Sequence, residues 1–269
     1  MAHSTEQQPG NYAEWTNPVK ARLAAGEAVF AITLTTNSLD AAVQAASLGF
    51  DFLWIEMEHS PITLETLRNI VLATRASATV PFARVPVNEL WTAKRVLDAG
   101  VCGVIFPFTT TPELARRATD ACHYPLTGRR GSGAGLAVRS WPGAGDYYDS
   151  ADANVVVITV VEEAAAVERI DEIAATPGVD VIFIGTSDLS FSLGLRGQQD
   201  HPLLNSAIEK IVAAAKRHGK FLGRPLRDPA EFEALRAQGF QLFQAPTDLD
   251  FLAAGGRAYL NRAAGNTPR

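Results

Sequence analysis

The chain has 269 residues, of which 47% are hydrophobic and 20% are charged, and its formal net charge is −5. These ordinary globular values exclude a disordered, collagen-like or low-complexity chain. The acidic balance offers no basic surface for a nucleic acid or an anionic membrane. No apolar run approaches the ~18–20 residues of a membrane span, and the polar N-terminus lacks the apolar core of a signal peptide.

We therefore expect a soluble cytoplasmic protein with neither a nucleic-acid nor a membrane partner. The two cysteines, Cys102 and Cys122, form neither a CxxC motif nor a zinc-finger spacing. In a reducing compartment such thiols behave as small buried hydrophobes, so we expect no disulfide.

Short β-rich runs alternate with amphipathic helical runs along almost the whole chain. In chain order, the expected strands cover Val29–Thr35, Asp51–Glu56, Val80–Val85, Val101–Phe106, Val155–Val161, Val179–Ile184, Phe221–Gly223 and Phe240–Gln244. The helices expected after them cover Leu39–Leu48, Leu64–Ala76, Leu90–Ala99, Pro112–Cys122, Ala165–Ala175, Leu203–Arg217, Pro229–Gln238 and Leu249–Leu260. Each strand and the helix after it form one βα unit, and there are eight such units.

The pattern has physical causes. The strands are continuous Val, Ile and Phe runs, as expected for a parallel sheet buried on both faces. Glycine, which tolerates the left-handed conformation at a helix end, stands just before several strands, at positions 49, 100, 178, 219 and 239. Ser38, Thr63 and Asp228 occupy plausible N-cap positions.

Eight βα units in a chain of this length favour an α/β fold of the (β/α)8 TIM-barrel type over a doubly wound sheet. The first strand–helix turn, residues 35–38, also lacks the glycines of a dinucleotide-binding fold. We expect residues 1–16 to form a flexible tail and residues 17–269 to form a single barrel domain with a C-terminal helix. The long irregular stretch Tyr124–Asn154 is of the kind that is usually functional or mobile.

Active sites of such barrels lie at the carboxyl ends of the strands. Glu162 and Asp188 follow the fifth and sixth strands at equivalent heights. Two oxygen ligands with open positions suit Mg²⁺ or Mn²⁺. The alternative is a pair of carboxylates that only form salt bridges with arginines.

Two other strand ends carry charged side chains. His59 follows Glu56 and Glu58, so it is either a general base whose tautomer one of these glutamates fixes, or a loop histidine satisfied by a carboxylate. Arg84, at the end of the third strand, binds either a substrate carboxylate or Glu58. The Arg129–Gly133 segment is either an anion cradle or a flexible basic loop.

Several motifs, in this order and spacing, resemble the HpcH/HpaI aldolase family of metal-dependent class II pyruvate aldolases. They are Phe50–His59, Arg84–Pro86, Leu97–Gly100, Tyr124–Gly131, Glu162 and Gly178–Ser190. The resemblance extends from about Asn17 to Leu260. It implies an aldehyde-lyase with a TIM barrel that reversibly cleaves 4-hydroxy-2-oxo acids to pyruvate and an aldehyde through a pyruvate enolate.

The resemblance also implies roles for individual residues. Glu162 and Asp188 match the ligands of a divalent metal ion, which would be Mg²⁺, Mn²⁺ or Co²⁺. His59 matches the catalytic histidine, and Arg84 matches the arginine that binds the keto oxygen and steadies the enolate. Asp98 matches an aspartate that reaches a neighbouring subunit's site in a homohexamer built as a trimer of dimers.

Other positions at the expected mouth complete the prediction. Glu56 stands where the family usually has an aspartate, and we count it among the catalytic residues. We expect Thr186 and Ser187, which precede Asp188, to contact the substrate. Arg224, after the seventh strand, could recognise a second carboxylate on the aldehyde or form a salt bridge, for example with Asp248.

Some positions depart from the family's pattern. Met57 replaces a small residue, Val160 stands where a glutamine is usual, and Thr186 replaces a proline. Two alternatives stay open, and the departures motivate the second. One is a related lyase acting on an acyl-CoA substrate of the citramalyl-CoA or malyl-CoA type. The other is a weakened barrel that binds 2-oxo acids without turnover.

Overall fold

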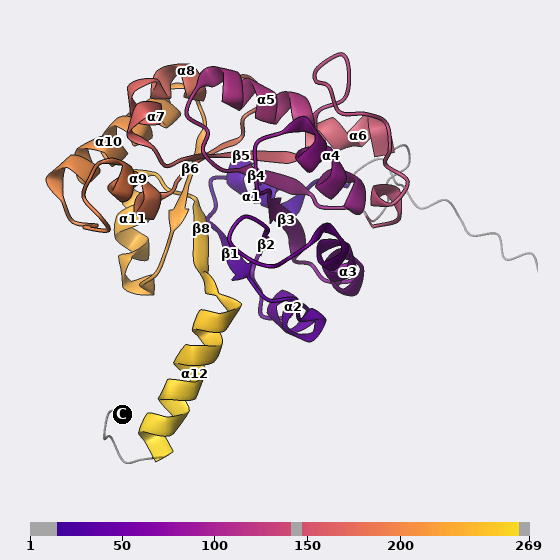
Figure 1. Cartoon of the computed structure of the whole chain (residues 1–269). Helices are drawn as coiled ribbons and strands as arrows, with labels where there is room; N and C mark the ends of the chain where they lie inside the picture. Colours follow the sequence, from indigo (N-terminus) through magenta and orange to yellow (C-terminus); the bar gives the residue numbers. More distant parts are fainter. Residues whose placement is uncertain (1–14, 141–146, 264–269) are drawn as a thin grey trace, which may run out of the picture.

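The computed structural model describes residues 15–140 and 147–263, in which eight parallel strands close into a barrel in sequence order (Figure 1). The strands are β1 (Val29–Leu34), β2 (Phe52–Glu56), β3 (Val80–Arg84), β4 (Gly103–Phe106), β5 (Val156–Val161), β6 (Val181–Ile184), β7 (Phe221–Pro225) and β8 (Leu242–Thr247). β8 pairs with β1, which closes the ring. This architecture confirms the predicted (β/α)8 fold.

Helices surround the barrel (Figure 1). They are α1 (Pro18–Ala24), α2 (Leu39–Ala46), α3 (Leu64–Thr74), α4 (Leu90–Ala99), α5 (Pro112–Cys122), α6 (Tyr147–Asn154), α7 (Ala164–Glu168), α8 (Ile170–Ala174), α9 (Thr186–Ser192), α10 (Pro202–Arg217), α11 (Phe232–Gln238) and α12 (Asp248–Ala263), with 3₁₀ turns η2 (Ala137–Arg139) and η3 (Pro229–Glu231). The predicted N-caps are confirmed, since Ser38, Thr63 and Asp228 each accept a backbone N–H at a helix start. Gly100 and Gly239 end α4 and α11 with φ near +108°.

Three helices were not predicted, namely α1, α6 and α9. α1 buries Val19 and Leu23, and Asn17 before it donates to the carbonyls of Cys102 and Asn154. Such contacts join residues far apart in sequence, so local patterning does not reveal them. α6 lies within the predicted irregular stretch, where residues 141–146 are outside the described part. The predicted tail 1–16 also lies outside it, apart from Trp15 and Thr16.

The side chains inside the barrel alternate with those facing the helices, as the pleat of a strand requires. Aromatic rings fill much of the interior, with Phe52 and Phe82 4.6 Å apart between ring centroids and Trp54 and Phe183 4.9 Å apart. A Cβ added at Gly103 would lie 2.7 Å from the Phe82 ring. Small residues on one strand therefore make room for rings on its neighbour. The same alternation aims the next inward positions, Glu56 and Arg84, at the carboxyl-end mouth.

α12 extends away from the barrel wall (Figure 1). None of its residues is buried. Its start is held firmly, because Asp248 accepts hydrogen bonds from the backbone N–H groups and hydroxyls of Thr35 and Thr36. Thr247 and Asp250 form a reciprocal capping box.

Two further findings concern the cysteines and the hydropathy of the helices. Cys102 and Cys122 are free and buried, as predicted. No helix within residues 15–140 or 147–263 combines the length and the hydropathy needed to cross a bilayer.

Candidate active site

Glu56, the last residue of β2, organises the mouth of the barrel. Its side chain is only 2% exposed and accepts four hydrogen bonds. One oxygen accepts from the backbone N–H groups of Glu58 and His59 at 2.8 and 3.0 Å. The other accepts from Trp54 Nε1 at 3.2 Å and from Arg84 Nε at 2.6 Å. Glu56 therefore shapes the loop after β2 and positions Arg84, and it does not touch the His59 ring.

Arg84 extends from β3 into the mouth, where two carboxylates hold it. Besides the bond to Glu56, its Nη1 lies 3.2 Å from Glu58 Oε2. Its guanidinium carbon lies 5.8 Å from the centre of the Trp54 ring. Within the described part of the chain, Nη2 has no hydrogen-bond partner. The bound guanidinium thus keeps one nitrogen for another oxygen.

Glu58 links Arg84 to the predicted catalytic histidine. Its Oε2 lies 3.6 Å from His59 Nε2, and the His59 side chain is 61% exposed at the mouth. Burial raises the pKa of Glu58 to about 7; Arg84 opposes this shift, and the charges of Glu56 and Asp188 add to it. Glu58, not Glu56, is therefore the carboxylate beside the His59 ring.

Glu162 follows β5 and is 2% exposed. Burial raises its pKa to about 7, against the hydrogen bond that it accepts from the backbone N–H of Phe108 at 2.7 Å. Phe108 makes this contact from the left-handed region, with φ of +48°, a conformation that costs energy for a non-glycine residue. A Cβ added at Gly185 would lie 2.8 Å from Glu162 Oε2, so only glycine fits there.

Asp188 lies in the first turn of α9, the helix that begins directly after β6. Asp188 is exposed, and its charge contributes to the raised pKa of both Glu58 and Glu162, as expected for carboxylates at the same end of the barrel. Thr186, which is buried, and Ser187, which is half-buried, precede it at the start of α9. The structure thus places at one mouth residues that end or follow β2, β3, β5 and β6 and that lie up to 132 positions apart in the sequence.

The donor set at the mouth fits a hard divalent cation. Glu58, Glu162 and Asp188 supply only oxygen atoms, and their mutual repulsion is what a cation would relieve. Oε2 of Glu58 is buried and has no hydrogen-bond donor, although it pairs ionically with Arg84. No three His, Cys, Asp or Glu side chains of the described residues form a ready metal cluster. The carboxylates thus offer oxygen ligands at the mouth, but they are not already gathered around one point.

Two predicted site residues lie elsewhere. Arg224 is on the outward face of β7, where it lines an outer pocket with α10 residues and lies 5.4 Å from the Phe240 ring centre. The inward neighbour is Gly223, so strand alternation turns Arg224 away from the mouth. Asp248, its suggested partner, bonds instead to Thr35 and Thr36. The prediction that Arg224 contacts the substrate is corrected accordingly.

Asp98 lies near the end of α4, at the opposite end of this barrel from the mouth. Its carboxylate accepts from Arg130 at 2.9 Å. Arg130 is 1% exposed and lies 4.7 and 5.5 Å from the ring centres of Tyr124 and Tyr147. Arg130 is thus neither part of a flexible loop nor open to an anion. Any role of Asp98 in catalysis requires the mouth of another subunit.

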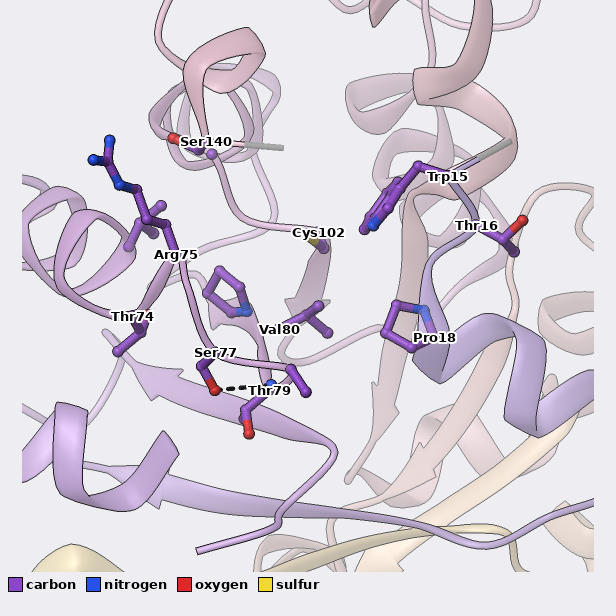
Figure 2. A pocket seen from close by; sticks show the side chains of 14 residues that line it. Trp15, Thr16, Pro18, Thr74, Arg75, Ser77, Thr79, Val80, Cys102 and Ser140 are labelled. Carbon is purple, nitrogen blue, oxygen red and sulfur yellow. Dashed lines mark hydrogen bonds between the residues drawn. The ribbon is translucent and has the colours of Figure 1, made fainter. Parts of the chain in front are cut away.

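Sequence reasoning missed two contributors. The backbone N–H of Phe108 carries no sequence signal, because any residue can donate it. Glu58 was considered only as a partner of His59 or of Arg84, although the Glu-x-Glu-His spacing could have suggested that both glutamates face inward. A separate pocket of about 330 Å³ lies at the amino-terminal end of the barrel. Figure 2 shows Trp15, Val80 and Cys102 among the side chains that line it. No carboxylate or histidine lines it, so it has none of this chemistry.

Comparison with known proteins places this geometry in a family. Residues 32–254 match the sequence model of the HpcH/HpaI aldolase/citrate lyase family. The chain belongs to this family. The predicted resemblance is thereby confirmed, and the protein is an aldolase-type enzyme of the lyase class.

Individual relatives agree with the family assignment. The chain is 35% identical over 255 residues to the hydroxypyruvate/pyruvate aldolase of Paraburkholderia phytofirmans, covering 91% of this chain and 97% of the relative. It is 37% identical over 232 residues to the 5-keto-4-deoxy-D-glucarate aldolase of Salmonella paratyphi C, covering 84% and 88%. A solved HpcH/HpaI aldolase/citrate lyase family protein from Burkholderia cenocepacia J2315 superposes with a TM-score of 0.85 at 34% identity, covering 93% and 100%.

Proposed function

We propose that this member of the HpcH/HpaI family is a divalent-metal-dependent aldolase that reversibly cleaves 4-hydroxy-2-oxo acids to pyruvate and an aldehyde. The observation that carries the proposal is that Arg84 ends β3, Glu162 follows β5 and Asp188 lies in the first turn of the helix after β6, so all three lie at the carboxyl-end mouth. Pyruvate offers a carboxylate and a keto oxygen, which suit a cation and a guanidinium. The name of the Paraburkholderia relative, a hydroxypyruvate/pyruvate aldolase, supports the same substrate class.

Glu162 and Asp188 would hold the ion, which we propose to be Mg²⁺, Mn²⁺ or Co²⁺. A divalent ion supplies Lewis acidity that stabilises negative charge on the keto oxygen. Glu162 is prepared for this task, because Gly185 and the Phe108 N–H fix its carboxylate before any ligand arrives. Such preorganisation avoids a rearrangement during the reaction.

Arg84 and His59 would carry the remaining steps. In the cleavage direction, the 4-hydroxyl loses its proton to His59 and becomes the aldehyde carbonyl as the C3–C4 bond breaks. The electron pair of that bond forms the C2–C3 double bond of the enolate, which becomes pyruvate when C3 takes up a proton. The free Nη2 of Arg84 donates to the developing enolate oxygen. Glu58 keeps the His59 ring close to Arg84, since its Oε2 contacts both side chains. Thr186 and Ser187 would contact the substrate beside Asp188.

The proposal is tested by removing the metal and the guanidinium separately. Enzyme treated with EDTA should release no pyruvate from a 4-hydroxy-2-oxo acid, and added Mg²⁺, Mn²⁺ or Co²⁺ should restore release. Undiminished release by the chelated enzyme contradicts the proposal. Arg84→Ala should lose most turnover while keeping its fold by circular dichroism. Oxamate binding without turnover of any aldehyde would instead favour a binding protein.

We also propose that the enzyme is a homo-oligomer, a hexamer built as a trimer of dimers, in which Asp98 serves a neighbouring mouth. The exposed apolar side chains of α12 support association of copies. They are Leu249, Phe251, Leu252, Tyr259 and Leu260. If Asp98 acts between subunits, mixing inactive His59→Ala and Asp98→Ala subunits should recover part of the activity. No recovery from mixed, exchanged subunits counts against a shared site.

A further inference from the structure

A hollow of about 510 Å³ lies at the mouth of the barrel. It lies at the carboxyl ends of β7, β8 and β1, which adjoin where the ring closes (Figure 1). Its lining residues are Thr33, Pro225, Arg227, Gln244, Ala245, Pro246, Thr247 and Asp250. None of them belongs to the proposed catalytic group.

The hollow and the catalytic group occupy complementary parts of one ring. The catalytic group lies at the ends of β2, β3, β5 and β6, and consists of Glu56, Arg84, Glu162 and Asp188. The hollow lies instead at the ends of β7, β8 and β1. An aldolase binds pyruvate and an aldehyde at its mouth, and the proposed function places pyruvate beside the catalytic group. The hollow is the part of the mouth that remains for the rest of the aldehyde, the tail that takes no part in the reaction.

We infer that this hollow binds the tail of the aldehyde and that Arg227 selects aldehydes whose tail ends in a carboxylate. This inference rests on the proposed function. It moves the recognition of a second carboxylate from Arg224, which faces outward on β7, to the arginine three residues later, which lines the mouth.

Arg227 is available for a ligand. It is exposed, and within the described part of the chain it makes no hydrogen bond and no ion pair. A guanidinium presents two parallel N–H groups that match a carboxylate. A carboxylate tail near the mouth's edge would therefore find a bidentate partner at little cost in desolvation.

Asp250 is the acidic group in this hollow, and it is already engaged. Its Oδ2 accepts from the backbone N–H and the hydroxyl of Thr247 at 3.0 and 2.8 Å, as part of the cap of α12. It interacts with Arg227 electrostatically but not within ion-pair distance. Asp250 thus lies near Arg227 without occupying its N–H groups.

Polar side chains form the inner wall of the hollow. Gln244 Nε2 donates to Thr33 Oγ1 at 3.1 Å, and that hydroxyl donates to the Ala245 carbonyl at 3.2 Å. The amide oxygen of Gln244 has no partner within the described residues. It can accept a hydrogen bond from a hydroxylated tail, whereas a purely apolar tail would leave these groups unsatisfied.

The test compares two four-carbon aldehydes, 4-oxobutanoate and butanal, as partners for pyruvate with Mg²⁺. The wild-type enzyme should have the higher kcat/KM with 4-oxobutanoate. Arg227→Met should lower the ratio of the two kcat/KM values at least tenfold, and Arg227→Lys should retain part of the preference, because it keeps the charge. Arg75→Met, at the other end of the barrel (Figure 2), removes the same charge and should leave the ratio unchanged.

A ratio that Arg227→Met leaves within twofold of wild type overturns the inference, and so does an equal fall for Arg75→Met. Exchange of the pyruvate methyl protons in D₂O, followed by NMR without any aldehyde, tests the proposed function separately. If the wild-type enzyme exchanges these protons but the ratio does not move, only the role of Arg227 fails. If it neither exchanges them nor adds pyruvate to an aldehyde, both proposals fail.

Discussion

Replacing Glu56 by glutamine tests the interpretation of this residue as the organiser of the mouth. Its two oxygens accept four hydrogen bonds at 2.6–3.2 Å in a nearly water-free position. A glutamine has only one acceptor oxygen, so its amino group must face two of the four donors. If the oxygen keeps the Glu58 and His59 N–H groups, the amino group faces Trp54 Nε1 and Arg84 Nε.

The cost follows from these lost contacts. Both lost hydrogen bonds are accepted by a charged carboxylate, and such bonds contribute about 1.5–3 kcal/mol each, so the loss in unfolding free energy is at least roughly 3 kcal/mol. For a chain of this size each kcal/mol lowers the melting temperature by about 2–4 °C, which predicts a fall of roughly 6–12 °C for Glu56→Gln. Thermal unfolding followed by circular dichroism measures it.

Glu65, on the exposed side of α3, provides the control. Glu65→Gln makes the same chemical change at the surface, where substitutions stay within about 0.5 kcal/mol. If Glu56→Gln melts within ~2 °C of the wild-type protein, Glu56 does not hold the loop and Arg84 in the way described.

Three further predictions concern the site and its support. Gly185→Ala should weaken Mn²⁺ binding at least tenfold by calorimetry, because the new methyl group would lie 2.8 Å from the Glu162 carboxylate, whereas Gly131→Ala, with open space around it, should bind normally. The raised pKa of Glu162, about 7 against an ordinary 4.5, means that the folded state holds a proton that the unfolded chain releases. This contribution to the stability of the metal-free protein is full below pH 4.5 and is lost as the pH rises through 7, so the melting temperature should fall from pH 5 to 8. Glu162→Gln should flatten this dependence of the melting temperature on pH. An unchanged dependence in the variant contradicts a raised pKa of Glu162. Arg130→Met should lower the free energy of unfolding by about 3 kcal/mol, because it breaks a buried ion pair. Arg129→Met, at an exposed position, should lower it by less than about 0.5 kcal/mol. Equal melting temperatures for the two variants would refute the structural role of Arg130.

The barrel could be predicted because its signals are local. Continuous apolar strands, helix caps such as Ser38 and Thr63, and glycines at helix ends all depend on neighbours within a few residues. Because active sites of such barrels lie at the carboxyl ends of the strands, the sequence also predicted that Glu162, Asp188, Arg84 and the end of β2 share one mouth. The structure places them at that end of the barrel. The family motifs reinforced this grouping, because their order matches the order of the strands.

Other features depend on contacts between distant parts of the chain. The sequence alone could not show that Arg224 faces outward, because its direction depends on which residue of β7 enters the barrel. Nor could it show that Arg130 pairs with Asp98 across 32 positions. The same holds for the pKa of Glu58, which burial and three charges set together.

The alternating strand and helix pattern of this 269-residue chain thus determined its fold class and the end of the barrel that carries chemistry. Tertiary structure decided which charged side chains share that mouth and which one supports the others. The physical reason is that propensity and periodicity act over a few residues. Hydrogen bonding, burial and electrostatic repulsion at the mouth act between strands that meet only when the barrel closes.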